Sequence, residues 1–280
     1  MPTPTSRTPS GLTGRRPRLS DEETARRMLR AAITAVNRTG LTVSLEHISF
    51  EEVIREAGVS RSAAYRRWPY KDLFFSDLLK EIAAAATPAA ISREGTDEMI
   101  RRIVRGRLDR LRTPEQRHGL IMELVREGAR HDFQRIHGST EWRTYLALHA
   151  TFQSLPDGEL REEIRSVLAR SEHGFISAIA ATYEHMATLL GYRIRPETGA
   201  TYETVALLAS ATLRGLVTTA LSTPDVADRR VTAAPFGDPG PADWSLPALG
   251  VAATVTAFLE PDPGVEWTEE RIAEVTRALS

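Results

Sequence analysis

Cationic side chains cluster between residues 61 and 67, in a segment that predicts a short helix. Arg61, Ser62 and Ala63 would occupy its first turn, the part of a recognition helix that usually meets base edges. Arg66 and Arg67 would lie one turn further along. An arginine there can bind guanine O6 and N7 through two hydrogen bonds, which discriminates between bases by about 1–3 kcal/mol. These residue types indicate a surface that reads DNA.

Tyr65 and Lys71 are suited to contact phosphates. The Tyr65 hydroxyl can donate to a phosphate oxygen, and Lys71 would begin the next helix just after Pro69, where the helix dipole adds to its charge. Such contacts fix position without reading sequence. The alternative is an ordinary solvated basic face, which is the commoner role of an arbitrary arginine cluster.

The turn ahead of the cluster favours DNA over that alternative. A helix is predicted from Ser49 to Glu56, and Gly58 can adopt the positive φ that a tight turn between helices needs. Ser60 would cap the next helix. Ala64 and Trp68 then fall together on its inner side. This pattern predicts a helix-turn-helix.

Positive charge is concentrated in the same part of the chain. Residues 1 to 71 contain thirteen Arg and Lys against seven Asp and Glu, although all 280 residues together carry a net charge of −1. A nearly neutral chain that is basic at one end has an electrostatic footprint for a polyanion there.

The first eighty or so residues resemble the TetR family of transcriptional regulators. The resemblance rests on three motifs that keep their spacing: AGVS at 57–60, YRRW at 65–68 and KDLF at 71–74. It implies a three-helix DNA-binding domain that a fourth helix links to a larger helical domain, which binds a small molecule and dimerises. It also implies base contacts from Arg61, Ser62, Ala63 and Arg67, and phosphate contacts from Tyr65, Lys71 and Ser49.

The sequence departs from that family pattern in two places, and it does not decide the role of a third position, Glu51. The link from Gly40 to Ser49 is several residues longer than usual, and Ile54 replaces a common alanine. Glu51 stands where many relatives have a neutral or basic group. Its carboxylate would either repel phosphate or accept a hydrogen bond from cytosine N4.

The N-terminal residues predict a flexible basic arm followed by a helix. Ser20 and Glu23 form a capping box ahead of an apolar stripe, which predicts a helix over residues 21–39. Residues 1–19 are rich in Pro, Thr, Ser, Gly and Arg and have few apolar side chains to bury. Their arginines would either enter the minor groove or belong to a solubilising tail: Arg15, Arg16 and Arg18.

Composition and motifs argue against several other functions. The chain has no cysteine, so disulfides and thiolate chemistry are excluded, and its seven histidines lack the spacing of a helical metal site. We find no phosphate-binding loop, dinucleotide-binding turn or nucleophile elbow, so no enzyme activity, metal or cofactor is expected. Without a signal segment or an unbroken run of eighteen apolar residues, we expect a soluble cytoplasmic protein that does not contact a membrane.

The remainder of the chain predicts an all-α fold. We expect a DNA-binding domain with its linking helix over residues 20–86 and a helical effector-binding and dimerisation domain over 87–280, with the boundary near Thr87-Pro88. Proline and glycine punctuation predicts helices over residues 96–112, 114–131, 141–153, 157–190, 196–221, 246–259 and 268–279. Residues 223–247 are expected to form a long surface loop.

Two apolar stripes at helical spacing need a buried partner. One comprises Ile176, Ile179, Tyr183, Met186 and Leu190, and the other Val205, Leu208, Thr212, Leu213, Leu216 and Val217. Each would lie either in a dimer interface, as the family resemblance implies, or in the core of one chain. A homodimer is expected in either case, because one recognition helix makes too few contacts for selective binding, and its operator would be roughly palindromic.

These observations predict a dimeric repressor that a largely apolar small molecule releases from double-stranded DNA by a population shift, with the fourth helix carrying the movement. The alternative is a DNA-binding regulator or activator without an effector. Aromatic side chains supply a candidate pocket whose residues would otherwise be ordinary core: Phe133, Trp142, Tyr145, His149, Phe152 and Phe175.

Overall fold

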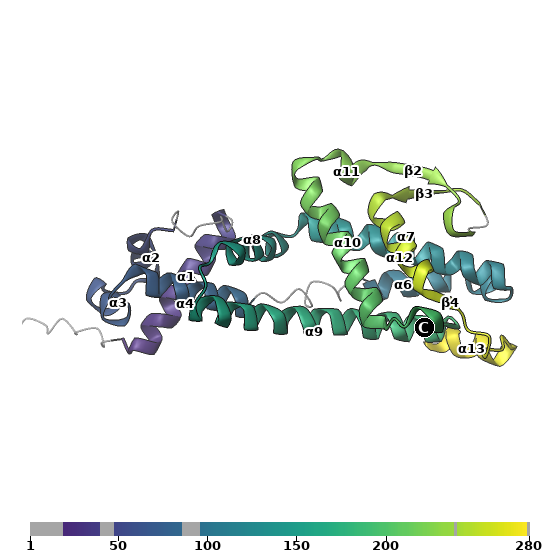
Figure 1. Cartoon of the computed structure of the whole chain (residues 1–280), viewed down its shortest axis with the longest axis horizontal. Helices are drawn as coiled ribbons and strands as arrows, with labels where there is room; N and C mark the ends of the chain where they lie inside the picture. The colour runs from purple at the N-terminus through teal and green to yellow at the C-terminus, as the bar shows by residue number, and fades with distance from the viewer. Residues whose placement is uncertain (1–18, 40–47, 86–95, 238–239, 279–280) are drawn as a thin grey trace, which may run out of the picture.

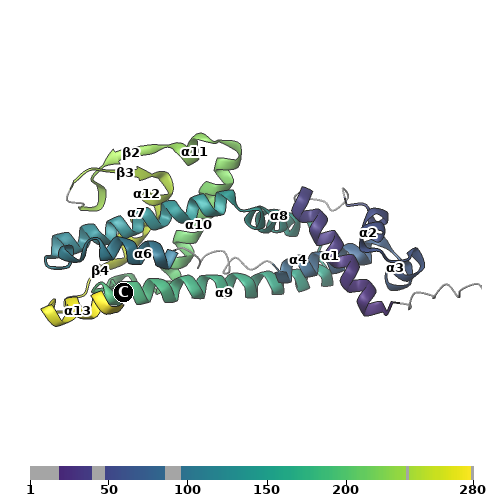
Figure 2. The same cartoon turned by 180° about the vertical axis from the view of Figure 1, so that it is seen from behind.

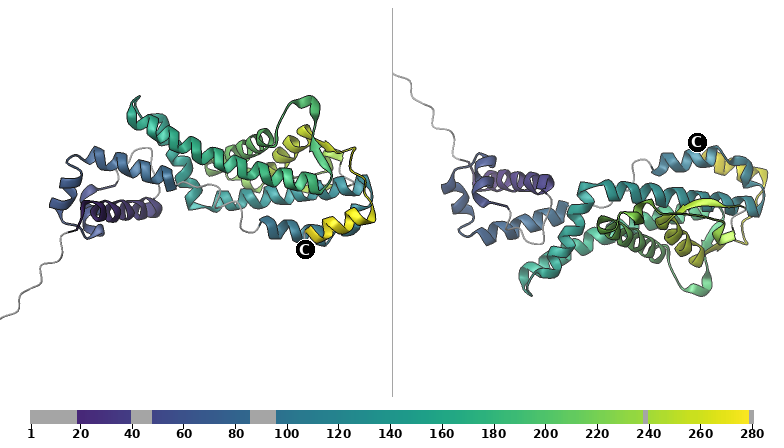
Figure 3. Two further views of the ribbon diagram at one scale, coloured as in Figure 1. Left: turned by 90° about the horizontal axis from the view of Figure 1, so that it is seen from below. Right: turned by 90° about the horizontal axis from the view of Figure 1, so that it is seen from above.

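The computed structural model describes residues 19–39, 48–85, 96–237 and 240–278. Most of them are helical, as the sequence predicts, and the molecule is elongated (Figure 1). The four N-terminal helices lie at one end, beside the helix Thr140–Ser154 and the start of the helix Glu159–Leu189. Most of the other helices lie at the opposite end, which the view from behind also shows (Figure 2). The views from below and above show the same two ends (Figure 3).

Four helices build the N-terminal end: α1 (Asp21–Thr39), α2 (Phe50–Ala57), α3 (Arg61–Arg67) and α4 (Lys71–Ala85). The Ser20 hydroxyl accepts a 3.0 Å hydrogen bond from the Glu23 N–H, which is the predicted cap of α1. The bounds of α1 match the prediction, and α2 begins one residue later than predicted because Ser49 is its N-cap. Arg15, Arg16, Arg18, the link 40–47 and the expected boundary near Thr87-Pro88 lie outside the described residues.

The later helices are α6 (Thr96–Arg105), α7 (Pro114–Gly138), α8 (Thr140–Ser154), α9 (Glu159–Leu189), α10 (Tyr202–Ser222), α11 (Asp225–Asp228), α12 (Leu246–Phe258) and α13 (Glu269–Ala278). Helix α7 runs past its predicted end at His131, and the next start signal is Ser139, whose hydroxyl accepts a hydrogen bond from the Trp142 N–H. The predicted helix over 96–112 instead stops at Arg105, and a short 3-10 turn, η2 (Leu108–Leu111), follows Gly106.

The described residues include short strands, which the sequence did not predict, in the expected loop 223–247 and between or after predicted helices. Strand β1 (Tyr192–Ile194) pairs antiparallel with β4 (Leu259–Pro261), and β2 (Arg230–Ala233) pairs antiparallel with β3 (Ala242–Ser245). The expected loop 223–247 therefore contains α11, this hairpin and the 3-10 turn η4 (Pro235–Gly237). Helix α10 does not begin at Pro196, which lies in the 3-10 turn η3 (Pro196–Thr198). It begins at Tyr202, because Thr201 and Thr204 form a reciprocal capping box.

The buried side chains form two clusters. The first comprises inward faces of α1 to α4, and it also includes Leu148 of α8 and Ile164 and Leu168 of α9. The second lies among α7, α9, α10 and α12, with η2 and α13 at its edge. Helix α9 contributes to both clusters, so this single 31-residue helix packs at both ends of the molecule.

Both apolar stripes predicted from the sequence pack mainly inside the chain. Ile176, Leu190, Leu213 and Val217 are buried in the second cluster, and Val205 is also buried. Leu208 of the second stripe is instead 41% exposed, and with Leu207 at 49% and Leu221 at 51% it forms an apolar surface of α10 that faces solvent. The length and apolarity of α10 would also suffice for a membrane span, although it packs against α7, α9 and α12.

Candidate nucleic-acid interface and ligand cavity

The turn between α2 and α3 has the geometry of a helix-turn-helix. Gly58 adopts φ 62° and ψ 32°, a left-handed conformation that disfavours other residues, and its N–H donates to the Arg55 carbonyl at 3.2 Å. The Ser60 hydroxyl then accepts from the Ala63 N–H at 3.2 Å and starts α3. This confirms the local structure that the glycine and serine predict.

Aromatic packing fixes α3 against its neighbours. Trp68, Phe74 and Phe50 are fully buried or nearly so, with ring centroids 5.1 Å apart for Trp68 and Phe74 and 4.9 Å apart for Phe50 and Phe74. The Trp68 indole N–H donates to the Asp77 carboxylate of α4 at 2.9 Å. Since both ends of α3 are held, its outer face projects from a rigid base.

Each arginine of α3 is paired with a carboxylate of another helix. Arg61 Nε lies 2.9 Å from Glu51, Arg66 Nη2 lies 2.6 Å from Asp21, and Arg67 Nη2 lies 3.1 Å from Asp77. These side chains remain largely exposed, Arg61 the most at 76%. Exposed pairs of this kind contribute roughly 0–1 kcal/mol each, so a phosphate or a guanine edge can replace the carboxylate at little cost.

The structure corrects one of the residues expected to face bases. Ala63 is 7% exposed and lies on the packed side of α3 with Ala64, so its methyl group does not face outward. With seven residues, α3 has just under two turns, and one residue of its first turn already faces inward. Ser62 is exposed, with its hydroxyl 3.2 Å from that of Ser60.

The three residues expected to hold phosphates lie on exposed helix starts or faces. Lys71 is exposed at the first position of α4 and has no ion-pair partner in the part of the chain that the structure describes. Ser49 is exposed at the N-cap of α2 and accepts from the Glu52 N–H at 3.4 Å. The Tyr65 hydroxyl donates to Glu51 at 2.9 Å. Glu51, whose role the sequence left open, therefore binds both Tyr65 and Arg61.

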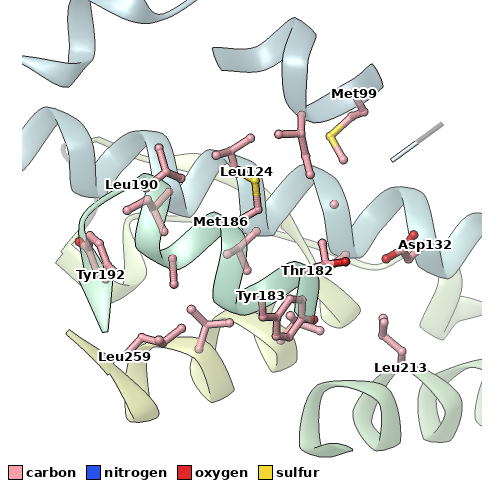
Figure 4. Close-up of a pocket in the computed structure, with 18 residues that line it drawn as sticks. Met99, Leu124, Asp132, Thr182, Tyr183, Met186, Leu190, Tyr192, Leu213 and Leu259 are labelled. Atoms are coloured by element: carbon pink, nitrogen blue, oxygen red, sulfur yellow. The ribbon is translucent and has the colours of Figure 1, made fainter. Parts of the chain in front are cut away.

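A cavity of about 160 Å³ lies at the other end of the molecule, within the second cluster (Figure 4). It is lined by side chains from α6, α7, α9, α10 and α12 and from the two strands β1 and β4. The lining is mainly apolar: Met99, Ile100, Ile121, Leu124, Val125, Gly128, Ala129, Asp132, Thr182, Tyr183, Met186, Ala187, Leu190, Tyr192, Leu213, Val251, Val255 and Leu259.

None of the six side chains predicted for a pocket lines this cavity: Phe133, Trp142, Tyr145, His149, Phe152 and Phe175. Most of them instead pack on one another. The Trp142 ring lies edge-on to Tyr145 and Phe175, with centroids 5.2 and 5.8 Å away, and Tyr145 lies edge-on to His149 at 4.5 Å. The Phe133 ring stacks on that of His137, and the Arg161 guanidinium lies over the Phe152 ring in a cation–π contact.

A signal for the true cavity was present in the sequence of α7. Leu124, Gly128 and Asp132 recur every four residues, which places a glycine and an acid on the same face as a core leucine. A small residue and a charge on an inward face leave space and polarity that a packed core does not need. On α9, Tyr183 and Met186 were recognised as an apolar stripe but not as cavity walls.

A hydrogen-bonded pair closes the cavity wall at β1. The His118 Nε2 lies 2.6 Å from the Phe236 carbonyl and donates to it, and in the neutral imidazole Nδ1 accepts a hydrogen bond from the Tyr192 hydroxyl at 2.9 Å. Burial raises the pKa of Tyr192 and that of Tyr183. Both phenols therefore stay neutral at physiological pH.

A half-buried polar cluster joins α8, α9 and α10 between the two ends. Arg214 donates to both carboxylate oxygens of Glu172, at 3.0 and 2.5 Å, and the Tyr145 hydroxyl donates to the same carboxylate at 2.5 Å. The cluster fixes the middle of α9. Lys80 of α4 pairs with Glu163 nearer the start of α9.

The chain is 34% identical over 104 residues to an uncharacterised HTH-type transcriptional regulator of Mycobacterium bovis, covering 37% of this chain and half the length of that protein. No family model matches.

Two solved structures are similar over most of the chain. One is SmeT, the repressor of the Stenotrophomonas maltophilia multidrug efflux pump SmeDEF, at 17% identity over 89% of this chain and 96% of that one, with a TM-score of 0.38. The other is a complex of SmeT with triclosan, at 18% identity over 88% and 95%, with a TM-score of 0.39. Similarity at this level does not extend to function.

Proposed function

We propose that this protein is a dimeric, sequence-specific DNA-binding regulator of the TetR type, and that it represses transcription until a small molecule releases it from its operator. The observation that carries the proposal is the α2–Gly58–α3 geometry, which holds α3 rigidly and presents its cationic face outward. The similarity to an HTH-type regulator supports it. Residues 20–86 would bind DNA, and residues 87–280 would bind the effector and dimerise.

DNA recognition would use the exposed groups around α3. Arg61 and Ser62, in its first turn, would meet base edges in the major groove, with Arg66 and Arg67 one turn further along. Lys71, Ser49 and Tyr65 would hold phosphates on either side. The basic arm with Arg15, Arg16 and Arg18 would add salt-dependent affinity from the minor groove.

The exposed face of α10 supports a homodimer. Leu207, Leu208 and Leu221 lie on one side of this helix together with the exposed small residues Ala211 and Gly215. An apolar helix face of this kind is stable in water when a second copy covers it. A two-fold dimer would place two copies of α3 on a roughly palindromic site.

Effector binding would act on DNA affinity through α9. Thr182, Tyr183 and Met186 of α9 line the cavity, while Ile164 and Leu168 of the same helix pack in the cluster that contains Leu78 and Leu79 of α4. A ligand that prefers one position of α9 would therefore shift α4 and, with it, α3. To release DNA strongly, the ligand needs about 5.5 kcal/mol of preference for the released state.

The proposal is tested by selecting bound sequences from random duplex DNA with the purified full-length chain at physiological salt. An enriched palindromic motif supports a dimeric regulator acting on cytoplasmic DNA, and copies of the motif in the genome would show which promoters it covers. A folded dimer that enriches no motif would overturn it. If the motif is bound but no cavity ligand weakens binding, the protein is a regulator without an effector.

A further inference from the structure

The polar groups of the cavity gather at one end. Asp132 of α7 and Thr182 and Tyr183 of α9 lie together there, while the rest of the wall consists almost entirely of hydrocarbon side chains (Figure 4). The charge of Asp132 adds to burial in raising the pKa of Tyr183, which reflects how near the two side chains are. A ligand in this cavity would meet apolar walls along its length and polar atoms at one tip only.

That polar end offers mainly hydrogen-bond acceptors. The Thr182 hydroxyl donates to the Ala178 carbonyl at 3.1 Å, so its oxygen is left to accept. The Asp132 carboxylate is acceptor-only when ionised. Arg135 donates to it at 3.3 Å, but a carboxylate has about four acceptor sites, so this contact does not prevent a ligand from donating to it as well.

The described lining at this end contains a single charged group. Among the described residues that line the cavity, Asp132 is the only one charged at neutral pH, and none is Lys, Arg or His. A carboxylate on the ligand would be repelled by the Asp132 carboxylate, and Arg135, which pairs with Asp132, is not among the residues that line the cavity. A ligand ammonium would instead make a charge-assisted hydrogen bond, which is stronger than the bond of a neutral donor.

The volume of the cavity indicates what it can enclose. An apolar cavity of about 150 Å³ holds one benzene ring, and the present cavity is about 160 Å³. The enclosed part of the occupant is therefore a single ring or a short chain that carries one small polar group.

We propose that the effector is a small primary amine with one aromatic ring or a short alkyl chain, bound as its ammonium ion with the nitrogen donating to Asp132 and Thr182. This rests on the proposed function only in taking the occupant of the cavity as the effector. The hydrocarbon part lies against Met186, Leu213 and Val251.

The test compares three probes of the same shape: benzylamine, benzyl alcohol and benzoate. Their affinities for the purified full-length protein are measured by titration calorimetry at pH 7. Benzylamine is expected to bind at least about fivefold more tightly than benzyl alcohol, and benzoate most weakly, because a charge-assisted bond gains roughly 1 kcal/mol over a neutral one. Equal binding of the amine and the alcohol, tighter binding of benzoate, or no binding of benzylamine overturns the proposal.

Variants assign any preference to the polar end. Asp132→Asn should bring benzylamine and benzyl alcohol within about twofold of each other while the alcohol affinity stays near the wild-type value. Thr182→Val keeps the side-chain shape and should weaken only the binding of benzylamine. It therefore provides a second test of the polar end if the Asp132→Asn protein does not fold. Glu127→Gln removes another carboxylate of α7 that pairs with Arg130 outside the cavity, and it should leave all three affinities unchanged.

A cavity-filling variant checks that the probes bind at this place. A Cβ at Gly128 would lie 3.7 Å from the Met99 methyl group, in the lining itself, so Gly128→Leu should remove the binding of all three probes. An amine preference that survives Asp132→Asn and Thr182→Val, or binding that survives Gly128→Leu, overturns the proposal. The DNA selection is done without probes, so a palindromic motif with no amine preference would leave the regulator intact and reject only this ligand.

Discussion

The Tyr65 hydroxyl donates a 2.9 Å hydrogen bond to one carboxylate oxygen of Glu51, and the other oxygen of Glu51 lies 2.9 Å from Arg61 Nε. One acidic side chain thus holds a candidate phosphate contact and a candidate base contact at once. The hydrogen bond to Glu51 raises the pKa of Tyr65, so the phenol remains a donor. The negative charge of Glu51 repels a phosphate that approaches α3.

Replacing Glu51 by Gln is expected to strengthen binding to random duplex DNA while reducing discrimination. Removal of a like charge near a phosphate is worth about 1 kcal/mol, or roughly fivefold, in a high-dielectric setting. Arg61 would lose the partner that orients it, so the ratio of operator to random-DNA affinity should fall. Fluorescence anisotropy with selected and scrambled duplexes measures both affinities.

Glu56→Gln is the matched control for Glu51. Glu56 is in the last turn of α2 and pairs with Arg38 of α1 at 3.4 Å, away from α3. Glu56→Gln should change neither the affinity for the selected duplex nor the affinity for the scrambled duplex. If Glu51→Gln weakens binding to both duplexes equally, Glu51 serves the fold of the interface and not its selectivity.

Lys71→Ala is expected to weaken binding to operator and random DNA alike, because a phosphate contact does not depend on sequence. The slope of log affinity against log salt should decrease in magnitude by about one. The only other lysine, Lys80, pairs with Glu163 of α9 on the far side of the linking helix, so Lys80→Ala is the control and should leave the slope unchanged. An unchanged slope in Lys71→Ala would place its ammonium away from phosphate.

Leu207→Glu is expected to dissociate the dimer, because it places a charge in the middle of the exposed apolar face of α10. Sedimentation velocity should show a monomer at micromolar concentration, and DNA affinity should fall because only one half-site is held. Val231→Glu makes the same chemical change on β2, where the valine is 36% exposed, and should leave the dimer intact. If the Leu207→Glu protein remains a dimer, the dimer interface lies on a surface other than this face of α10.

The sequence was sufficient to predict the helix-turn-helix end because its signals are local. Gly58, Ser60 and Pro69 punctuate short helices, and the structure has α2, α3 and α4 at the expected positions. Only Ala63 was misjudged among the groups around α3 that the structure describes. Its orientation depends on how a seven-residue helix rolls against its neighbours, which no local signal encodes.

The sequence was insufficient for the cavity because a void is a property of how several helices pack. Trp142, Tyr145 and Phe175 are residue types that are common in pockets, but here their rings pack against one another. Gly128 and Asp132 line the cavity only because α9 and α12 pack opposite α7. The strands β1 and β4 were missed for a similar reason. They are three residues long and are defined by pairing across about 65 residues of chain.

Glu172→Gln should lower the free energy of unfolding by about 2–3 kcal/mol at pH 7, because it leaves the Arg214 guanidinium, which is 18% exposed, without its counter-charge. Burial opposes ionisation of Glu172, but the hydrogen bonds from Arg214 and Tyr145 outweigh it, so the pKa of this carboxyl is lowered. A lowered pKa in the folded state stabilises the protein above the unfolded value near 4.3, and that contribution is lost as the pH falls through the folded value.

The difference between wild type and Glu172→Gln should therefore be constant from pH 7 to about pH 5 and should shrink below about pH 4. Urea unfolding at one fixed protein concentration measures it, since a dimer's stability depends on concentration. Glu162→Gln removes an exposed carboxylate that pairs with Arg165 on the same helix, and it should change stability little at any pH. A Glu172→Gln protein as stable as wild type at pH 7 would show that the cluster does not hold α8, α9 and α10 together.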